Sequence, residues 1–359
     1  MKTAIALSGG VDSSVAAYLL KEQGHDLVGV FMRFWHDQNS QCAGCIENKC
    51  CNQESLQTIK RLCAKLDIPL KIYNFEKEFK KSVVDRFVNY YDAGLTPNPC
   101  VWCNEDIKFT MLYQKANQDL SINNVATGHY ANIETINDYQ YIKRGKDAKK
   151  DQSYFLYRVP PDILKHTIFP VGNMTKTQVK KLADKYLPDF HFHQKKESQD
   201  LCFYPEDSYQ SFIGKYARQL TKPGIIVNEK GERVGEHSGL VNYTVGQRQG
   251  LRIGGGEIYY VKRIDTEQNK LIVSQRSHIL CDNIKLIHPI LTPVLLQKRS
   301  NIFQVQIRYG HNPANCQVNI SRDYKNITLK FEKAQFAATP GQHAVIYQKN
   351  IVIGGGEIR

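Results

Sequence analysis

The sequence contains no hydrophobic run that approaches the roughly 18 residues needed to cross a membrane. It also contains no low-complexity tract. Met1 leads directly into the first predicted strand, which leaves no room for the charged and apolar segments of a secretion signal. These absences argue against a membrane or secreted protein and predict a cytoplasmic location.

Acidic residues are the scarcer of the two charge types. The 359 residues include 48 Lys and Arg but only 35 Asp and Glu, which gives a formal net charge of +13. Such an excess favours a polyanionic partner, although lysines also serve solubility alone. In a cytosolic chain of this length, the ten cysteines are expected to be catalytic, metal-binding or buried rather than paired in structural disulfides.

Residues 4–14 combine a short apolar strand, a tight glycine turn and the start of a helix. The turn lacks both the Gly-Lys-Ser/Thr ending of a Walker loop and the G-x-G-x-x-G spacing of dinucleotide folds, so it places no lysine for a terminal phosphate. Gly9 and Gly10 let the backbone approach an anion, which the N–H groups of the following helix then face. The segment resembles the SGGxDS PP-loop of ATP pyrophosphatases, which split ATP between the α and β phosphates.

Strands and helices alternate through the first two hundred residues, which predicts an α/β domain over 1–205 with a parallel sheet covered on both faces. A helix over 13–23 is followed by a strand over 27–31, a helix after Asn52 and a strand over 70–75. A further strand ends at Gly128 and His129. These two residues are therefore expected at the carboxyl edge of the sheet, where open α/β folds bind ligands.

After about residue 205 the chain becomes rich in short strands separated by Gly, Asn and Asp turns. We predict a β-rich central domain over 206–278 and a C-terminal β-barrel over 279–359. Strands of the central domain are expected at 225–228, 239–245, 257–264 and 270–274. Strands of the barrel are expected at 303–309, 316–321, 326–331 and 344–348.

Three cysteine-bearing segments are candidates for the chemistry. Cys100 and Cys103 lie in a proline-bounded loop ahead of a predicted helix, a place that lowers the pKa of a thiol and favours the thiolate. Cys202 lies in a polar loop near the end of the first domain. The third segment could form a metal clip, although zinc sites usually have better separated pairs; it contains Cys42, Cys45, Cys50 and Cys51.

At these residues a resemblance to one family becomes specific. The PP-loop and several shorter strings occur in the order typical of tRNA-specific 2-thiouridylases of the MnmA/TrmU type, across nearly the whole chain. These strings are Phe31-Met32, Asn98-Pro99, Cys103-Asn104, Ala126-Thr127-Gly128-His129-Tyr130, Lys150-Asp151-Gln152-Ser153-Tyr154-Phe155-Leu156, Cys202-Phe203, Thr244-Val245-Gly246-Gln247-Arg248, Arg308-Tyr309, Pro340-Gly341-Gln342 and Gly354-Gly355-Gly356. The resemblance implies thiolation of C2 of the wobble uridine in tRNAs for lysine, glutamate and glutamine.

The resemblance also implies a mechanism and its residues. ATP, with Mg²⁺, would adenylate O2 of the uridine, so that AMP becomes the leaving group. Cys202 would receive sulfur as a persulfide from a cysteine desulfurase or a sulfur-relay protein, and Cys103 would release sulfide or close a disulfide. Asp12 is a candidate accessory residue. The implied ATP-binding residues are Ala6, Leu7, Ser8, Gly9, Gly10, Val11, Asp12, Ser13, Met32 and Gly128.

The resemblance further implies contacts with tRNA. Single-stranded bases stack on aromatic side chains and are read on their edges, while Lys and Arg hold phosphates. No one of these residues would indicate tRNA binding by itself, and they are candidates because they match the tRNA-contacting positions of the family. They are Asn98, Pro99, Cys100, His129, Lys150, Asp151, Gln152, Arg308, Tyr309 and Gln342.

Cys100 departs from the family pattern, in which Asp usually follows Asn-Pro. Cys100, Cys103 and Cys202 could instead hold a 4Fe-4S cluster with one iron open to sulfide. The persulfide route is the first interpretation, and Cys100 is then a spare thiol or an alternative disulfide partner of Cys103. Two other classes stay open. A different PP-loop ATP pyrophosphatase acting on a small molecule needs no cysteine pair, and a non-catalytic RNA-binding protein leaves the PP-loop idle.

Overall fold

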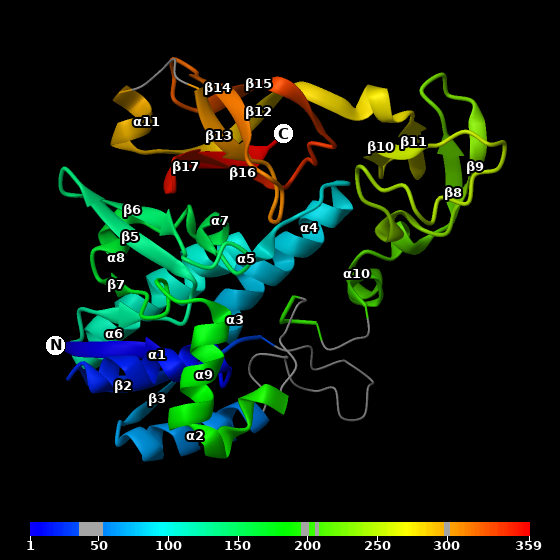
Figure 1. Ribbon diagram of the computed structural model, residues 1–359. Coiled ribbons are helices and arrows are strands. Elements are labelled where there is room, and N and C mark those ends of the chain that lie inside the picture. Colours follow the sequence, from blue (N-terminus) through cyan, green and yellow to red (C-terminus); the bar gives the residue numbers. More distant parts are fainter. Residues whose placement is uncertain (36–52, 195–200, 205–207, 298–301) are drawn as a thin grey trace. The chain divides into compact units, whose positions relative to one another are not determined.

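Figure 1 shows the computed structural model of the chain, which describes residues 1–35, 53–194, 201–204, 208–297 and 302–359. Its internal contacts separate two compact units. The N-terminal unit comprises Met1–Val84, Pro99–Glu206 and Asn350–Val352. The C-terminal unit comprises Asp207–Lys349 and Ile353–Arg359, together with Asp85–Asn98. Residues 85–98 thus group with the later part of the chain, although they lie within the range 1–205 that was predicted as the first domain.

The N-terminal unit is built on a five-stranded parallel sheet, as predicted (Figure 1). Its strand order is β3-β2-β1-β4-β7 and every pairing is parallel. The central strand β1 is buried over Thr3–Ala6, because it is covered by neighbours on both edges and carries apolar side chains. The strands are β1 (Lys2–Ala6), β2 (Asp26–Arg33), β3 (Leu70–Asn74), β4 (Val125–Ala126) and β7 (Thr167–Ile168).

Three helices of this unit share one core cluster with the sheet: α1 (Val11–Glu22), α2 (Gln53–Leu66) and α9 (Lys176–Tyr186). The predicted apolar stripe of α2 is confirmed, since Ile59 and Leu62 are fully buried. Cys63 belongs to the same stripe, and burial raises the pKa of its thiol to about 11. This cysteine is therefore a core residue and not a nucleophile.

A second group of helices leads to and follows the cysteine segment. It begins with α3 (Glu76–Phe79), a π-helical turn (Lys80–Asp85) and α4 (Arg86–Asp92), and continues through α5 (Pro99–Trp102), a π-helical stretch (Cys103–Met111) and α6 (Leu112–Leu120). Short helices α7 (Ser153–Leu156) and α8 (Pro161–Leu164) and 3-10 turns at Pro188–Phe190 and Phe192–Gln194 complete the unit. The hairpin β5 (Ala131–Ile136) and β6 (Tyr139–Arg144) was not predicted.

The central part of the C-terminal unit follows α10 (Tyr209–Tyr216) and is a four-stranded sheet in the order β10-β11-β8-β9. The strands are β8 (Gly224–Val227), β9 (Arg233–His237), β10 (Tyr260–Asp265) and β11 (Lys270–Ser274). The predicted strand over 239–245 is wrong. Leu240–Asn242 forms a 3-10 turn that buries Leu240 and Val241, and a short apolar run does not by itself distinguish a strand from such a turn.

The C-terminal barrel is confirmed. Six antiparallel strands follow one another in the order β12-β15-β14-β13-β16-β17, and the pairing of Leu286 with Ile358 joins β12 to β17 and closes the barrel. The strands are β12 (Leu280–Leu291), β13 (Ile302–Gln306), β14 (Ala314–Ile320), β15 (Asn326–Phe336), β16 (His343–Gln348) and β17 (Ile351–Ile358), with α11 (Pro293–Gln297) after β12. Alternate residues such as Val305, Val318 and Leu329 fill its interior. Among the described residues, no helix is long and apolar enough to cross a membrane.

Candidate functional site

The PP-loop connects the end of β1 to the start of α1. Gly9 has φ +75°, a left-handed conformation that favours glycine, and a Cβ there would also lie 3.0 Å from the Cα of Ser55. Hydroxyl groups fix the turn, because the Ser8 amide donates to Ser13 Oγ at 3.3 Å and Ser14 Oγ donates to the Gly10 carbonyl at 2.9 Å. The loop is thus held open toward the N-terminus of a twelve-residue helix, which is anion-binding geometry.

Gly128 packs directly against this loop. A Cβ at Gly128 would lie 2.6 Å from the Ser13 nitrogen and 2.7 Å from the Asp12 carbonyl carbon, so any side chain would collide with backbone. The end of β4 therefore forms a wall of the PP-loop, at the edge of the sheet that the sequence indicated. Met32 lies near the carboxyl end of β2 and is 8% exposed.

Asp12 is held by two side chains from distant parts of the chain. Lys176 Nζ lies 2.8 and 2.7 Å from its two carboxylate oxygens, and the Tyr130 hydroxyl donates to Oδ1 at 2.6 Å. The Lys176 side chain is only 12% exposed, and its ammonium lies 5.8 Å from the Tyr130 ring centre. An ammonium group therefore lies beside the PP-loop even though the loop itself contains no lysine.

Lys176 is not among the site residues predicted from the sequence. Its local signal is the capping box of Thr175 and Gln178, which begins α9 and fixes Lys176 in the first turn of that helix. The Lys176 amide also donates to Asp147 Oδ2 at 2.9 Å. Nothing local connects Lys176 with Asp12, which is 164 residues away in sequence.

The Cys100–Cys103 segment forms the start of a helix. Trp102, at the junction of α5 with the π-helical stretch, has φ −65° and ψ −42°, so the helix runs through it without interruption. Val101 and Trp102 are fully buried and fix this turn in the core. Cys100 is exposed, whereas Cys103 is 4% exposed. The two thiols thus lie on one short helical turn in contrasting surroundings.

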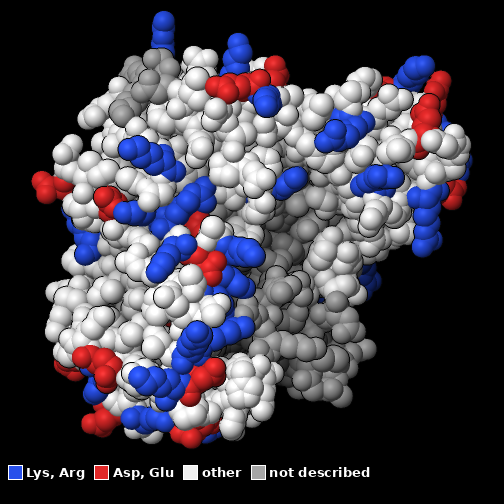
Figure 2. All heavy atoms as spheres, viewed as in Figure 1, with Lys and Arg blue, Asp and Glu red and all other residues white. Residues whose placement is uncertain are grey.

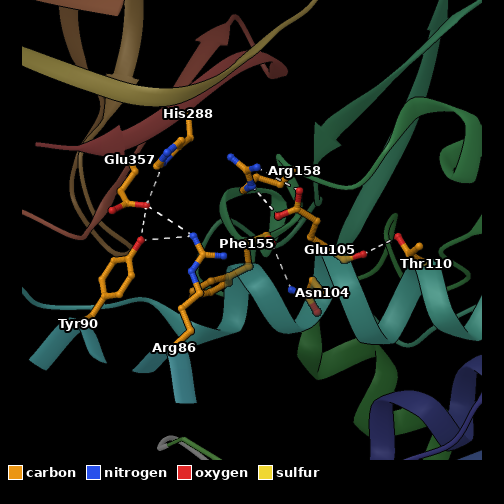
Figure 3. Close-up of polar contacts among 9 residues, drawn as sticks. All are labelled: Arg86, Tyr90, Asn104, Glu105, Thr110, Phe155, Arg158, His288 and Glu357. Atoms are coloured by element: carbon orange, nitrogen blue, oxygen red, sulfur yellow. Dashed lines mark hydrogen bonds and ion pairs between the residues drawn. The ribbon is translucent and has the colours of Figure 1, made fainter. Parts of the chain in front are cut away.

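Several polar side chains that follow Cys103 form hydrogen bonds (Figure 3). Asn104 Nδ2 donates to the Phe155 carbonyl at 3.2 Å, and Asn104 Oδ1 is buried without a hydrogen-bond partner among the described residues. Glu105 receives two bonds from Arg158, at 2.5 Å from Nε and 3.1 Å from Nη2. Thr110 Oγ1 donates to the Glu105 carbonyl at 2.6 Å. These bonds tie the cysteine helix to the segment around Phe155 and Arg158.

Cys202 is half-buried, and the side chain of its neighbour Phe203 is buried. The Phe203 ring packs edge-on against Phe79 at 5.9 Å, and Phe79 stacks on Phe34 at 4.9 Å. In the part of the chain that the structure describes, no three His, Cys, Asp or Glu side chains form a group that could hold a metal ion. Cys100, Cys103 and Cys202 are all described and are not part of such a group, and a cluster held by them stays a prediction. The third cysteine segment, over 42–51, lies outside the described residues.

The predicted tRNA residues of the N-terminal unit differ in their surroundings. Asp151 is buried, and its oxygens accept bonds from Arg144 Nη1 at 2.8 Å, the Gly145 amide at 2.9 Å and the Ser153 hydroxyl at 2.8 Å. Gln152 Oε1 accepts from the Tyr130 amide at 2.9 Å. Asp151 thus stabilises its own loop, and Gln152 ties that loop to Tyr130. Contact of either side chain with tRNA stays a prediction. Lys150, on the same loop, is half-buried.

His129 packs against the rings of Phe109 and Phe169, with centroids 5.5 and 6.3 Å away. Its Nδ1 is 2.8 Å from Thr127 Oγ1. Burial, with a smaller contribution from Lys108, lowers the pKa of His129 to about 3. The imidazole is therefore neutral at physiological pH, and it can pack against a base or share a hydrogen bond but cannot pair with a phosphate as a cation.

In the C-terminal unit, Gln342 binds the segment that precedes the cysteine helix. Its Nε2 donates to the carbonyls of Thr96 at 3.0 Å and Pro97 at 3.2 Å, and the Thr96 amide donates to the Pro340 carbonyl at 2.9 Å. A Cβ at Gly341, which has φ +87°, would lie 3.0 Å from that same Thr96 carbonyl. The predicted tRNA residue Gln342 thus has a structural role that its sequence did not reveal.

A buried carboxylate also joins α4 to the barrel (Figure 3). Glu357 accepts a hydrogen bond from the Tyr90 hydroxyl at 2.7 Å, and Arg86 and His288 lie 3.7 and 3.8 Å from it. This network explains why residues 85–98 belong to the C-terminal unit. Arg308 and Tyr309 follow β13 on an exposed turn, where Tyr309 is 46% exposed.

Lys and Arg side chains are spread over the visible face of the molecule, most of which carries neither charge (Figure 2), and the formal net charge of the chain is +13. Acidic side chains are interspersed among them. The charge distribution therefore agrees with a polyanionic ligand but does not by itself identify one.

Comparison with known proteins assigns the chain to a family. The family model described as tRNA methyl transferase HUP domain matches residues 1–206, the tRNA methyl transferase PRC-barrel domain matches 210–275, and the Aminomethyltransferase beta-barrel domain matches 276–358. The chain is 40% identical to the tRNA-specific 2-thiouridylase MnmA of Lachnoclostridium phytofermentans, with 99% of each chain covered. The chain belongs to the MnmA family. It is also 39% identical to the MnmA of Herpetosiphon aurantiacus over 99% of this chain and 98% of that one.

Membership of the MnmA family confirms the resemblance on which the sequence analysis depended. The three matched segments follow the same succession as the parallel-sheet unit, the four-stranded sheet and the barrel. The site residues that the resemblance implies stay predictions. Among those outside the PP-loop, Gly128 packs directly against it.

Proposed function

We propose that this chain is a tRNA-uridine 2-sulfurtransferase, which uses ATP to replace O2 of the wobble uridine with sulfur in tRNAs for lysine, glutamate and glutamine. The full-length similarity to the MnmA relatives supports this proposal. The single structural observation that carries it is a PP-loop with Gly128 packed against it and the ammonium of Lys176 beside it, in the same unit as Cys103 and Cys202.

The PP-loop side of the site activates the uridine. The backbone N–H groups at the start of α1 bind the phosphates of ATP, and the Lys176 ammonium neutralises charge that the loop cannot, since the loop has no lysine of its own. A carbonyl oxygen is a poor leaving group, so attack of uridine O2 on the α-phosphate releases pyrophosphate and converts O2 into the leaving group AMP. A Mg²⁺ ion would be held by the ATP phosphates and the Asp12 carboxylate, and it would spread the phosphate charge.

The cysteines supply the sulfur. Cys202 carries the sulfur atom as a persulfide, Cys202-S-SH, received from a sulfur-donor protein. The Cys103 thiolate attacks Sγ of Cys202, which forms the Cys103–Cys202 disulfide and releases HS⁻. Hydrosulfide attacks C2 of the adenylated uridine and expels AMP. The two electrons that reduce the sulfane sulfur therefore come from the thiolate of Cys103, and a thiol reductant must restore the pair after each turnover.

The decisive experiment combines purified protein, ATP, a persulfide donor and unmodified tRNA. Nucleoside mass spectrometry should show 2-thiouridine, and AMP should form in equal amount. AMP release without tRNA, in the presence of a small nucleophile, would instead support another PP-loop pyrophosphatase. Binding of tRNA with neither product would support an RNA-binding protein and refute the proposal.

A further inference from the structure

Cys100 and Cys103 form a C-x-x-C pair on one uninterrupted helical turn. Residues three apart in an α-helix have Cα atoms about 5 Å apart, from the rise of 1.5 Å per residue and the radius of 2.3 Å. Disulfides span Cα separations of about 4.4–6.8 Å. The helical backbone angles at Trp102, φ −65° and ψ −42°, keep the pair in this range. The two cysteines can therefore bond to each other with little movement of the backbone.

The two thiols differ in their exposure to solvent, and this difference suits disulfide exchange. Cys103 is 4% exposed, whereas Cys100 is exposed. The residues between them, Val101 and Trp102, are fully buried and hold the turn in place. A disulfide that includes Cys100 is accessible to a reductant in solution, whereas a disulfide of Cys103 with Cys202 joins one buried and one half-buried sulfur.

We propose that Cys100 is a resolving thiol for the reaction. This inference rests on the proposed function and concerns the step after sulfur transfer. The Cys100 thiolate attacks Sγ of Cys103 in the Cys103–Cys202 disulfide. A Cys100–Cys103 bond forms, the Cys103–Cys202 bond breaks, and the electron pair leaves on Cys202 as a thiolate. Cys202 is then free to receive another sulfur atom, and a thiol reductant of low molecular weight or a dithiol protein reduces the exposed Cys100–Cys103 disulfide.

A resolving role of Cys100 predicts different effects of its substitution on the first turnover and on the later turnovers. Cys100 forms no bond in the transfer of a preloaded sulfur atom to the uridine, so Cys100→Ser should lower single-turnover thiolation far less than steady-state thiolation. Without the resolving thiol, the reductant must reach the less accessible Cys103–Cys202 bond directly. We therefore expect the steady-state rate with a limiting thiol reductant to fall about tenfold or more, and to recover as the reductant concentration is raised.

The experiment uses the full chain with an anticodon stem-loop RNA and ATP, and measures single-turnover thiolation, steady-state thiolation and the disulfides present after rapid alkylation. In the wild type, peptide mapping should show a Cys100–Cys103 disulfide, and in Cys100→Ser a Cys103–Cys202 disulfide should accumulate. Cys281→Ser is the matched control, because Cys281 is half-buried and lies in the C-terminal unit. It should behave as the wild type in all three measurements.

Equal single-turnover and steady-state losses in Cys100→Ser would overturn the inference, since Cys100 would then act during sulfur transfer. Loss of both activities together with loss of bound iron would also overturn it, in favour of a cluster. Absence of any Cys100–Cys103 disulfide in the cycling wild type is a third contrary result. Failure of the wild type to thiolate the RNA even once would refute the proposed function itself, which distinguishes the two failures.

Discussion

Replacing Lys176 by Met removes an ammonium group from beside the PP-loop and keeps the length and most of the volume of the side chain. In the structure Lys176 Nζ contacts both carboxylate oxygens of Asp12, at 2.8 and 2.7 Å. Hydrogen bonds to charged groups contribute about 1.5–3 kcal/mol. Because Asp12 keeps its bond from Tyr130 and its side chain is 31% exposed, we expect the free energy of unfolding to fall by about 1.5 kcal/mol, at the lower end of that range.

The expected effect on catalysis is larger than the effect on stability. If the Lys176 ammonium stabilises the charge that develops on the phosphates, its loss should lower kcat for adenylation by about 100- to 1000-fold. This corresponds to about 3–4 kcal/mol. The part of the activation free-energy loss that exceeds the loss of unfolding free energy is the part that indicates a role of Lys176 in the reaction.

The assay measures AMP and pyrophosphate release in the presence of tRNA, beside thermal and urea unfolding of the same samples. Lys181→Met is the matched control, because Lys181 is exposed on the same helix α9. Lys176→Arg keeps a cation and should retain part of the activity. A Lys176→Met protein that is less stable but releases AMP within about threefold of the wild type would refute the reasoning and leave Lys176 as a structural partner of Asp12.

Three further predictions follow from the site. Gly128→Ala should lower ATP affinity at least tenfold in equilibrium dialysis, because its Cβ would lie 2.6 Å from a PP-loop nitrogen; unchanged affinity would mean that the loop can move aside. Gln342→Leu should lower kcat for thiolation more than it weakens tRNA binding in filter assays, because Gln342 holds the segment ahead of the cysteine helix. Arg308→Ala should instead weaken tRNA binding and lower the salt slope of that binding by about one unit. The control variant Gln317→Leu, at an exposed position, should change neither kcat nor tRNA binding. His129 has a pKa lowered from 6.5 to about 3 by burial, so the unfolded state binds the extra proton first and stability should be lost as pH falls below about 6.5. His129 should account for about 2 kcal/mol of the stability lost between pH 7.5 and pH 5. Urea titrations of His129→Gln should show that much less pH dependence than the wild type, and the remaining dependence belongs to histidines such as His25, His237 and His311, whose pKa values burial also lowers.

The features that the sequence predicted correctly depend on neighbours along the chain. The PP-loop follows from glycines and hydroxyl residues within seven positions, and the buried face of α2 follows from the period of its apolar residues. Four of the six barrel strands follow from short apolar runs between turns, whereas β12 and β17, which close the barrel, were not predicted. The missed hairpin β5–β6 also had a local signal. Asn137 and Asp138 both have positive φ, 48° and 62°, as in a two-residue turn between strands.

The strand predicted over 239–245 was wrong because local pattern alone did not decide its structure. Its apolar residues are buried, as a strand would require, but they are buried in a 3-10 turn that begins at Gly239, with φ +128°. Packing against Leu220 and Thr221, whose carbonyls lie about 3.0 Å from where a Cβ at Gly239 would be, determines that backbone. The apolar composition of this segment indicates that it is buried, whereas its backbone conformation depends on the residues against which it packs.

The family, the α/β unit and the barrel were predicted correctly from sequence patterns alone, whereas the roles of the three cysteines stay predictions. Only the tertiary structure brought Lys176 to Asp12 across 164 residues, Gln342 to Thr96 across 246 residues, and α4 to the barrel. It also showed that Asp151 binds its own loop and that Cys103 is buried while Cys100 is exposed. The physical reason is that a local pattern sets which elements form, whereas the partner of a charged or amide side chain is set by how those elements pack, and this depends on the whole chain.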